Sequence, residues 1–162
     1  MKVKVETRLT SVEIGDLWTS YMNDSMVTCT LKYFLATVED TEIRPLLEYT
    51  LGISQKHTEF IAKVFKQENY PVPQGFNDSD VNLSAPRLYS DIFFPFYLEH
   101  MAKYGMLGYG ISLPLISRSD IRKFISDALT TSIEISNRVV QFLLSKGLYV
   151  RPPYVSIPQI YL

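Results

Sequence analysis

The amino-acid sequence predicts an all-α fold in which four helices form a bundle and one long crossover joins the second helix to the third. The chain has 162 residues, of which 46% are hydrophobic and 20% are charged. Four long segments carry apolar residues at spacings of three and four, which is typical of amphipathic helices. Their connections are short, long and short, the order found in four-helix bundles with one crossover. We therefore expect a single domain with its own core.

The first helix is predicted from Thr10 to about Val38. Thr10 and Glu13 have the spacing of a capping box, in which both side chains accept backbone hydrogen bonds at the start of a helix. The row of this helix that is predicted to face inward contains Ile14, Trp18, Tyr21, Ser25, Thr28 and Cys29. Asp24 is expected on the flank of that row.

The second helix is predicted from Ile43 to about Asn69, after a polar break at residues 39–41. Pro45 is compatible with this start, because a residue in the first helical turn needs no backbone donor. The row predicted to face inward contains Ile43, Leu47, Thr50, Ser54, His57 and Ile61. His57 is thus expected inside the bundle.

Residues 70–86 are rich in proline, glycine, asparagine and aspartate, which favour turns over helices. At about 3.3 Å per extended residue, this segment can return along the whole length of a bundle. The second and third helices are therefore expected to run parallel.

The third helix is predicted at about residues 87–113, and Pro95 is expected to kink or break it early. Its inward row is predicted to contain Phe94, Tyr97, Met101, Gly105 and Gly108. The fourth helix is predicted from Ser119 to Gly147, since glycine is a good C-terminal cap. The expected organisation is an N-terminal extension at 1–9, the bundle at 10–147 and an extended, proline-rich tail at 148–162.

Composition disfavours several classes of partner. Sixteen Lys and Arg residues balance seventeen Asp and Glu residues, so the chain lacks the basic excess that nucleic acid or an anionic membrane attracts. The longest uncharged stretch, residues 104–117, is too short to span a bilayer and contains Pro114. We expect no nucleic-acid partner and no membrane partner.

The single cysteine, Cys29, cannot form an internal disulfide, which favours a reducing, cytoplasmic location. Because it lies within a helical pattern, we interpret it as a buried, unreactive thiol. No Gly-x-Ser-x-Gly elbow is present in the sequence. We expect no catalytic residue, and enzymatic activity is the less favoured interpretation.

Bundles with one crossover often hold two iron ions, bound partly by Glu-x-x-His motifs. Such a motif is absent, because the residues three positions before His57 and His100 are Ser54 and Tyr97. We therefore expect no metal cofactor and interpret His57 as a neutral imidazole bonded to a hydroxyl such as that of Tyr97. Asp24 and His57 are weak candidates for a metal site, if the first helix is rotated by one position.

Two alternatives stay open at this point. One is an enzyme or metal-binding protein that uses iron or another divalent metal at an unusual site. Its candidate ligands are Asp24, Glu48, His57, Glu99, His100 and Glu134. The other is a small-molecule pocket lined by Ser25, Ser54, His57, Tyr97 and Met101. The direction in which the carboxylates point distinguishes the first alternative from a structural protein.

Surplus apolar faces indicate self-association. The first helix carries an additional apolar row, Val27, Leu31, Phe34 and Val38, and the third helix is apolar nearly all round. The net charge of −1 leaves little repulsion between copies. We expect a homo-oligomer.

Three segments carry a resemblance to a known family: Leu17–Met26, Tyr33–Leu35 after Cys29, and the closing Gly147–Pro153. They resemble a family of ferritin-like spore-coat proteins, related to coat protein F, from endospore-forming bacteria. The resemblance implies a ferritin-like bundle with no established reaction. It further implies a non-catalytic structural or interaction role, other coat proteins as partners, and a spore coat assembled from the mother-cell cytoplasm.

Overall fold

The computed structural model describes residues 7–155, and within this range it contains four α-helices and no strand. The α-helices are α1 (Ser11–Thr37), α2 (Arg44–Gln67), α3 (Phe93–Ser112) and α4 (Ser119–Ser145), and the short 3-10 helices are η1 (Asp78–Asp80) and η2 (Leu113–Leu115). The predicted all-α, four-helix class is confirmed. Of the predicted extension and tail, residues 1–6 and 156–162 lie outside the described residues.

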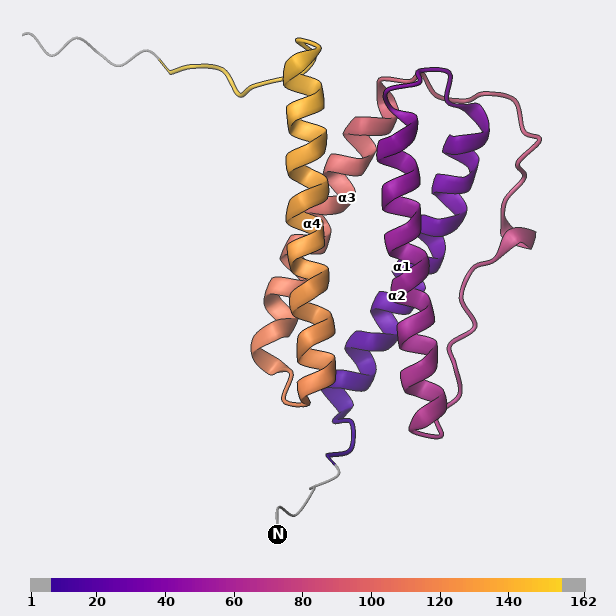
Figure 1. Ribbon diagram of the computed structural model, residues 1–162, viewed down its shortest axis with the longest axis vertical. Helices are drawn as coiled ribbons and strands as arrows, with labels where there is room; N and C mark the ends of the chain where they lie inside the picture. The colour runs from indigo at the N-terminus through magenta and orange to yellow at the C-terminus, as the bar shows by residue number, and fades with distance from the viewer. Residues whose placement is uncertain (1–6, 156–162) are drawn as a thin grey trace, which may run out of the picture.

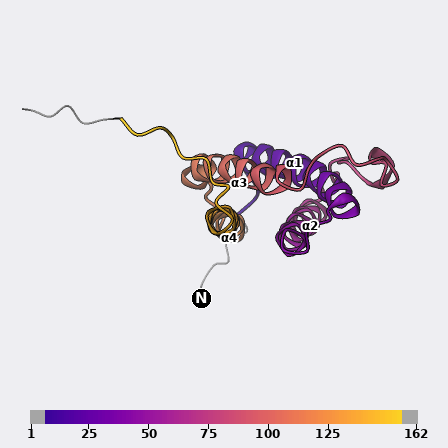
Figure 2. The same ribbon diagram turned by 90° about the horizontal axis from the view of Figure 1, so that it is seen from above.

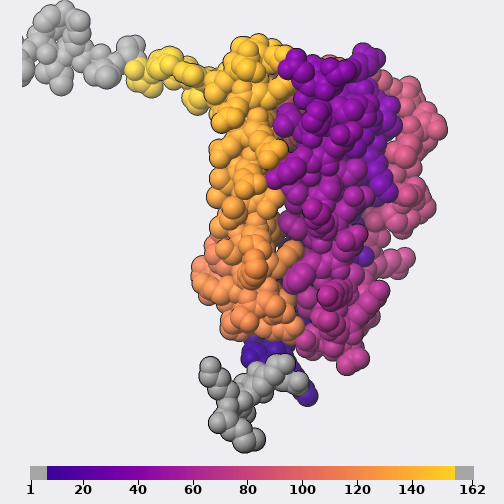
Figure 3. Space-filling model, viewed as in Figure 1, coloured from indigo at the N-terminus to yellow at the C-terminus, as the bar shows by residue number. Residues whose placement is uncertain are grey.

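The helices form two antiparallel hairpins, α1 with α2 and α3 with α4 (Figure 1). Seen from above, α1 and α3 lie side by side in one layer, and α2 and α4 form the other (Figure 2). Helices α4 and α2 cover one face of the molecule (Figure 3). None of the described helices is long and apolar enough to cross a membrane.

The segment between α2 and α3 packs along the outer side of α1. Ser25 Oγ accepts a hydrogen bond from the Phe76 amide at 3.0 Å, and the Tyr33 hydroxyl donates one to the Pro86 carbonyl at 2.7 Å. A Cβ atom at Gly75 would lie 2.6 Å from Ser25 Oγ, so only glycine fits this close approach. Cys29 also donates to the Asn77 carbonyl. Ser25, Cys29 and Tyr33, spaced by four residues on α1, therefore all form hydrogen bonds with this segment.

Both predicted caps are confirmed. Thr10 and Glu13 exchange the two hydrogen bonds of a capping box at the start of α1. Gly147 has a φ of 66°, and the amides of Gly147 and Leu148 bond the carbonyls of Leu144 and Leu143. This is a Schellman ending, which glycine favours because it adopts positive φ without steric cost.

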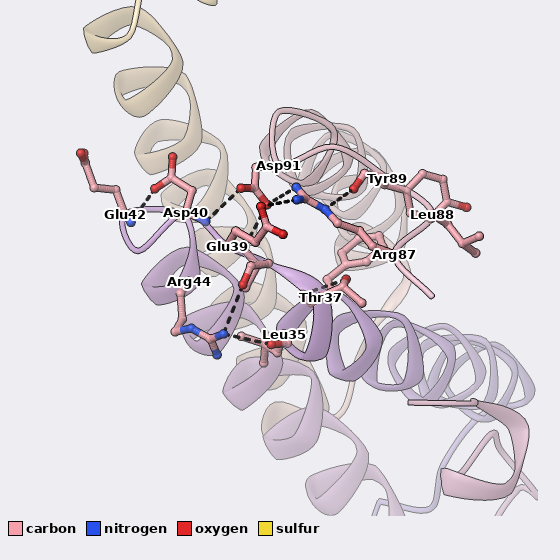
Figure 4. Close-up of polar contacts among 12 residues, drawn as sticks. Leu35, Thr37, Glu39, Asp40, Glu42, Arg44, Arg87, Leu88, Tyr89 and Asp91 are labelled. Carbon is pink, nitrogen blue, oxygen red and sulfur yellow. Dashed lines mark hydrogen bonds and ion pairs between the residues drawn. The ribbon is translucent and has the colours of Figure 1, made fainter. Parts of the chain in front are cut away.

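The third helix begins at Phe93 rather than at Arg87, so its predicted start is wrong. Asp91 accepts hydrogen bonds from the backbone amides of Glu39 and Asp40 at 3.2 and 2.9 Å. Arg87 forms ion pairs with Glu39 and Asp91 (Figure 4). These contacts fix residues 87–92 to the turn between α1 and α2 in a non-helical conformation.

The predicted kink at Pro95 is also wrong. Because α3 begins at Phe93, Pro95 lies in its first turn, where the missing amide donor costs no hydrogen bond. Pro95 is buried there. The proline thus marks the start of the helix and does not interrupt it.

The phase predicted for the first helix is wrong by about one position. Trp18 is 51% exposed, whereas Leu17 is fully buried. Helix α1 contacts α2, α3 and the segment that joins α2 to α3. Its apolar residues therefore point in several directions and do not form a single stripe. The consequence is that Asp24 points into the bundle.

The buried apolar residues form two separate clusters. The first, near the turn between α1 and α2, contains Leu31, Phe34 and Val38 of the row that we predicted to be surplus. That row packs within the chain, so it offers no face for a second copy. The second cluster lies near the other end of the bundle and includes Leu17 and Ile125. The level between the two clusters holds buried polar side chains, Ser20, Thr50, Ser54 and Ser132.

Candidate ligand-binding site

A cavity of about 490 Å³ lies between the two hairpins, at the polar level that separates the apolar clusters. All four helices line it. Its polar lining includes Asp16, Ser20, Asp24, Thr50, Ser54, His57, Tyr109, Ser112 and Ser132, and its apolar lining includes Val27, Ile53, Met101, Ala128 and Ile135. A cavity of this size is within the range of small-molecule sites.

Asp24 and His57 form an ion pair or hydrogen bond across the α1–α2 hairpin, with 3.2 Å between Oδ2 and Nδ1. Both side chains are largely buried, with 13% and 15% of their surface exposed. Burial raises the pKa of Asp24, while its hydrogen bonds with His57 and Ser54 act in the opposite direction. His57 pairs with this carboxylate and not with Tyr97, contrary to our interpretation of the sequence.

The ring of His57 is also fixed by aromatic neighbours. Phe124 of α4 contacts it edge-on, with 5.2 Å between ring centroids, and Tyr109 of α3 lies at 6.3 Å. His57 is therefore held by groups from α1, α3 and α4. The ring is well positioned to bridge the two hairpins.

Asp16 supplies a second carboxylate, two turns before Asp24 on α1. Its Oδ1 accepts a short hydrogen bond from the Ser112 hydroxyl at the end of α3. Its Oδ2 is the one buried side-chain nitrogen or oxygen in the described part of the chain that has no hydrogen-bond partner. Burial raises the pKa of Asp16, and the hydrogen bond from Ser112 lowers it.

Tyr109 lies within electrostatic reach of both carboxylates. Burial raises the pKa of its hydroxyl, the charges of Asp24 and Asp16 raise it further, and a hydrogen bond with Ser20 lowers it. The hydroxyl therefore keeps its proton over the physiological pH range. It can donate a hydrogen bond but cannot act as a base at neutral pH.

The structure brings together most of the pocket residues suggested by the sequence. Ser54, His57, Tyr97 and Met101 all line the cavity. Ser25 does not, because it is turned toward the segment after α2 and bonds the Phe76 amide.

Sequence reasoning missed Asp16, Ser20, Tyr109 and Ser112. A signal for the first two exists, since Asp16, Ser20 and Asp24 follow one another at intervals of four residues and so share one face of a helix. Tyr109 and Ser112 gave no such signal, because the apolar residues of α3 surround the helix and conceal which face is inward.

The six candidate metal ligands do not converge. Glu48 pairs with Arg44, and Glu134 accepts a hydrogen bond from Tyr49 at the surface. His100 contacts the ring of Tyr104. Among residues 7–155, no three His, Cys, Asp or Glu side chains are close enough together to hold a metal ion.

Cys29 lies outside the cavity. It is buried, and its thiol donates to the Asn77 carbonyl at 3.2 Å. Burial raises the pKa of this thiol, as do the charges of Asp80 and Asp78. A thiol with a raised pKa is a poor nucleophile.

Comparisons with known proteins place the chain in a family but give no reaction. Two solved structures have a similar fold. The first, from Bacillus halodurans C-125 and named as a candidate spore coat protein, has a TM-score of 0.82 at 14% identity over 94% of this chain and 98% of that chain. The second, a conserved hypothetical protein from Mycobacterium tuberculosis, has a TM-score of 0.68 at 15% identity over 83% of this chain and 99% of that chain. At these identities the likeness concerns the fold alone.

No curated protein matches the sequence. The family model described as a protein of unknown function, DUF3231, matches residues 1–159. Because this match covers nearly the whole chain, the protein belongs to the DUF3231 family.

Proposed function

We propose that this protein is a non-catalytic, ferritin-like binding protein associated with the spore coat, and that it holds a small molecule between its two hairpins. The observation that carries the proposal is the cavity of about 490 Å³ at the centre of the bundle. The buried part of this cavity is polar, at Ser20, Ser54 and Ser132, and its rim includes the exposed Thr19 and His100, so a ligand can enter from solvent. Convergent polar groups in a largely apolar pocket are typical of ligand sites.

The buried carboxylates of the cavity support binding over a purely structural role. A carboxyl group whose pKa is raised by folding holds its proton more tightly in the folded state, so its ionised form costs stability at neutral pH. Apolar residues at positions 16 and 24 would avoid this cost. Groups that reduce stability in this way are concentrated at functional sites.

Filling the cavity is expected to abolish binding. Ala128 is 1% exposed and lines the cavity, so Ala128→Leu places additional carbon atoms in the space that a ligand would occupy. We expect ligand-observed NMR to detect neutral and charged fragments that bind the unmodified protein and fail to bind this variant. Thr130→Leu, at an exposed position of the same helix, is the matched control and should bind normally. Identical binding to both variants, or no binding to any form, would contradict the proposal.

A metal-dependent activity is not part of the proposal. Asp24 and His57 offer two ligands, and a third is needed for a stable site.

Association with the coat is supported by the fold shared with the candidate coat protein and by the sequence segments that resemble the coat family. The long segment between α2 and α3 supports the ferritin-like part of the proposal, since such bundles have one long connection. A fluorescent fusion expressed in sporulating cells is expected to form a ring at the forespore surface. An even distribution through the mother cell would argue against coat association.

We also propose that copies of the chain associate through the outer face of α3. This face exposes large apolar side chains, Phe96, Tyr104, Leu107 and Ile111, and the exposed Leu115 of η2 follows them. From Tyr104 onward these residues are spaced by three and four, and Phe96 lies eight residues before Tyr104 on the same face. A net charge of −1 leaves little repulsion between copies.

Disrupting this face is expected to dissociate the oligomer. Sedimentation velocity should show a dimer or larger species for the unmodified protein, and a monomer for the double variant Leu107→Glu, Ile111→Glu. The control Ser126→Glu, at an exposed position of α4, should leave the mass unchanged. A monomer mass that does not depend on the concentration of the unmodified protein would refute self-association.

A further inference from the structure

The fixed charges around the cavity are all negative. Asp16 and Asp24 line it, and the described lining residues include neither lysine nor arginine. We propose that the molecule held in the cavity is a small organic cation, with an apolar body and a protonated amine that pairs with the carboxylate of Asp16. This inference rests on the proposed binding function and adds the chemical class of the ligand.

Asp16 is the carboxylate with capacity for a ligand. Its Oδ1 is occupied by the Ser112 hydroxyl, whereas its Oδ2 is buried and has no partner in the described structure. A buried oxygen without a donor is costly, and most such atoms in folded proteins are satisfied. An ammonium group would supply both the missing donor and the opposite charge.

Asp24 is already satisfied within the chain. Its Oδ2 lies 3.2 Å from His57 Nδ1, and Ser54 also forms a hydrogen bond with this carboxylate. Asp24 therefore needs no ammonium group from a ligand. Asp24 contributes negative potential to the cavity, while Asp16 has an oxygen without a donor in the described structure.

The other titratable groups of the cavity do not reverse its sign. Tyr109 keeps its proton and is neutral, and the rings of Tyr97 and Tyr104 also line the cavity. His57 is turned toward Asp24, with 3.2 Å between Nδ1 and Oδ2, and His100 is exposed. Aromatic faces attract organic cations, so these rings favour the same class of ligand.

The lining from α3 and α4 includes apolar side chains. They are Met101 and Ala102 of α3 and Ala128 and Ile135 of α4. A ligand that combines one ammonium group with a hydrocarbon or aromatic body would bury the body against these side chains. A carboxylate or phosphate ligand would instead face two carboxylates of its own sign.

Three probes of similar size and different charge test the inference: 2-phenylethylamine, 2-phenylethanol and 3-phenylpropionate. In isothermal titration calorimetry near pH 7, we expect the amine to bind the unmodified protein at least tenfold more tightly than the alcohol. The anionic probe should bind more weakly than either.

Asp16→Asn is expected to weaken amine binding at least tenfold and to leave alcohol binding unchanged, because it removes the charge and preserves the shape. Asp127→Asn, which alters an exposed carboxylate paired with Lys123, is the matched control and should change neither affinity. Circular dichroism is used to check that both variants fold. If Asp16→Asn does not fold, the comparison of amine and alcohol in the unmodified protein still decides the question.

The outcomes separate the two proposals. Equal affinities for amine and alcohol would overturn the cationic ligand and leave a binding cavity. Tighter binding of the anion would overturn it as well. If no probe binds, the proposed binding function fails together with the inference.

Discussion

Replacing Glu13 by glutamine is expected to lower the free energy of unfolding by about 3 kcal/mol at pH 7. Glu13 is fully buried, and its two oxygens accept hydrogen bonds from backbone amides of two different segments. The Thr10 amide donates to Oε2 at 2.8 Å, and the Ser117 and Arg118 amides donate to Oε1 at 2.9 and 2.8 Å. Glutamine retains one acceptor and turns an NH₂ group toward donors. The start of α1 would then lose its attachment to the turn before α4.

The same contacts make stability depend on pH. Burial by itself raises the pKa of Glu13, but the backbone hydrogen bonds from Thr10, Arg118 and Ser117 outweigh it and hold the pKa at about 2. The Arg118 guanidinium is turned away, toward Glu68 and Asp120. Because the folded-state pKa lies below that of the unfolded chain, this stabilisation is complete above about pH 5 and is lost as the pH falls toward 2.

Urea unfolding at pH 7, 4 and 3 tests both statements. The unmodified protein should lose stability across this series more steeply than Glu13→Gln does. Glu48→Gln, which alters an exposed carboxylate paired with Arg44, should change the free energy of unfolding by less than about 0.5 kcal/mol. Equal effects of the two substitutions would show that Glu13 does not anchor α1.

Phe34→Ala is expected to lower the free energy of unfolding by about 3 to 5 kcal/mol, the range for a large side chain removed from a core. Phe34 is 1% exposed, and its ring centroid lies 4.6 Å from Phe94, 5.1 Å from Tyr97 and 6.0 Å from Tyr89. It therefore joins α1 to α3 and to the segment before α3. The substitution leaves a cavity where the two hairpins meet.

The control for this prediction is Phe76→Ala, at a position of the segment between α2 and α3 that is 42% exposed. Chemical denaturation should show a much smaller loss for this variant. Similar losses for the two phenylalanines would mean that Phe34 does not hold the hairpins together.

The parts of the fold that follow from neighbouring residues could be predicted from the sequence. The Thr10–Glu13 capping box and the Gly147 ending each involve residues close in the chain. The inward row of α2 was also predicted correctly, since Leu47, Thr50, Ser54 and Ile61 are buried. This helix has a well-defined apolar face, so its phase can be determined from spacing alone.

The parts that depend on distant contacts could not be predicted. The start of α3 is determined by Asp91 and Arg87, which bind the turn at Glu39 and Asp40 far away in the sequence. The phase of α1 depends on three packing neighbours.

The candidate site illustrates both cases. The spacing of apolar residues in α2 predicts His57 inside the bundle. Asp24 pairs with it because α1 is rotated by about one position from its predicted phase. Asp16 shares the face of Asp24 and would have been found with the correct phase. The unpartnered oxygen of Asp16 and its contact with Ser112 depend on how α3 crosses α1, which no local pattern encodes.

The central claim is that the space between the hairpins is a binding site. Its most direct test is NMR of methyl groups during titration with 2-phenylethylamine and with 2-phenylethanol. Ile53, Met101 and Ile135 line the cavity, whereas Ile111 and Leu115 lie exposed outside it. We predict saturable chemical-shift changes for the methyl groups of the three cavity residues and unchanged resonances for the two exposed residues. Shifts confined to Ile111 and Leu115, or no saturable shift with either compound, would contradict the account.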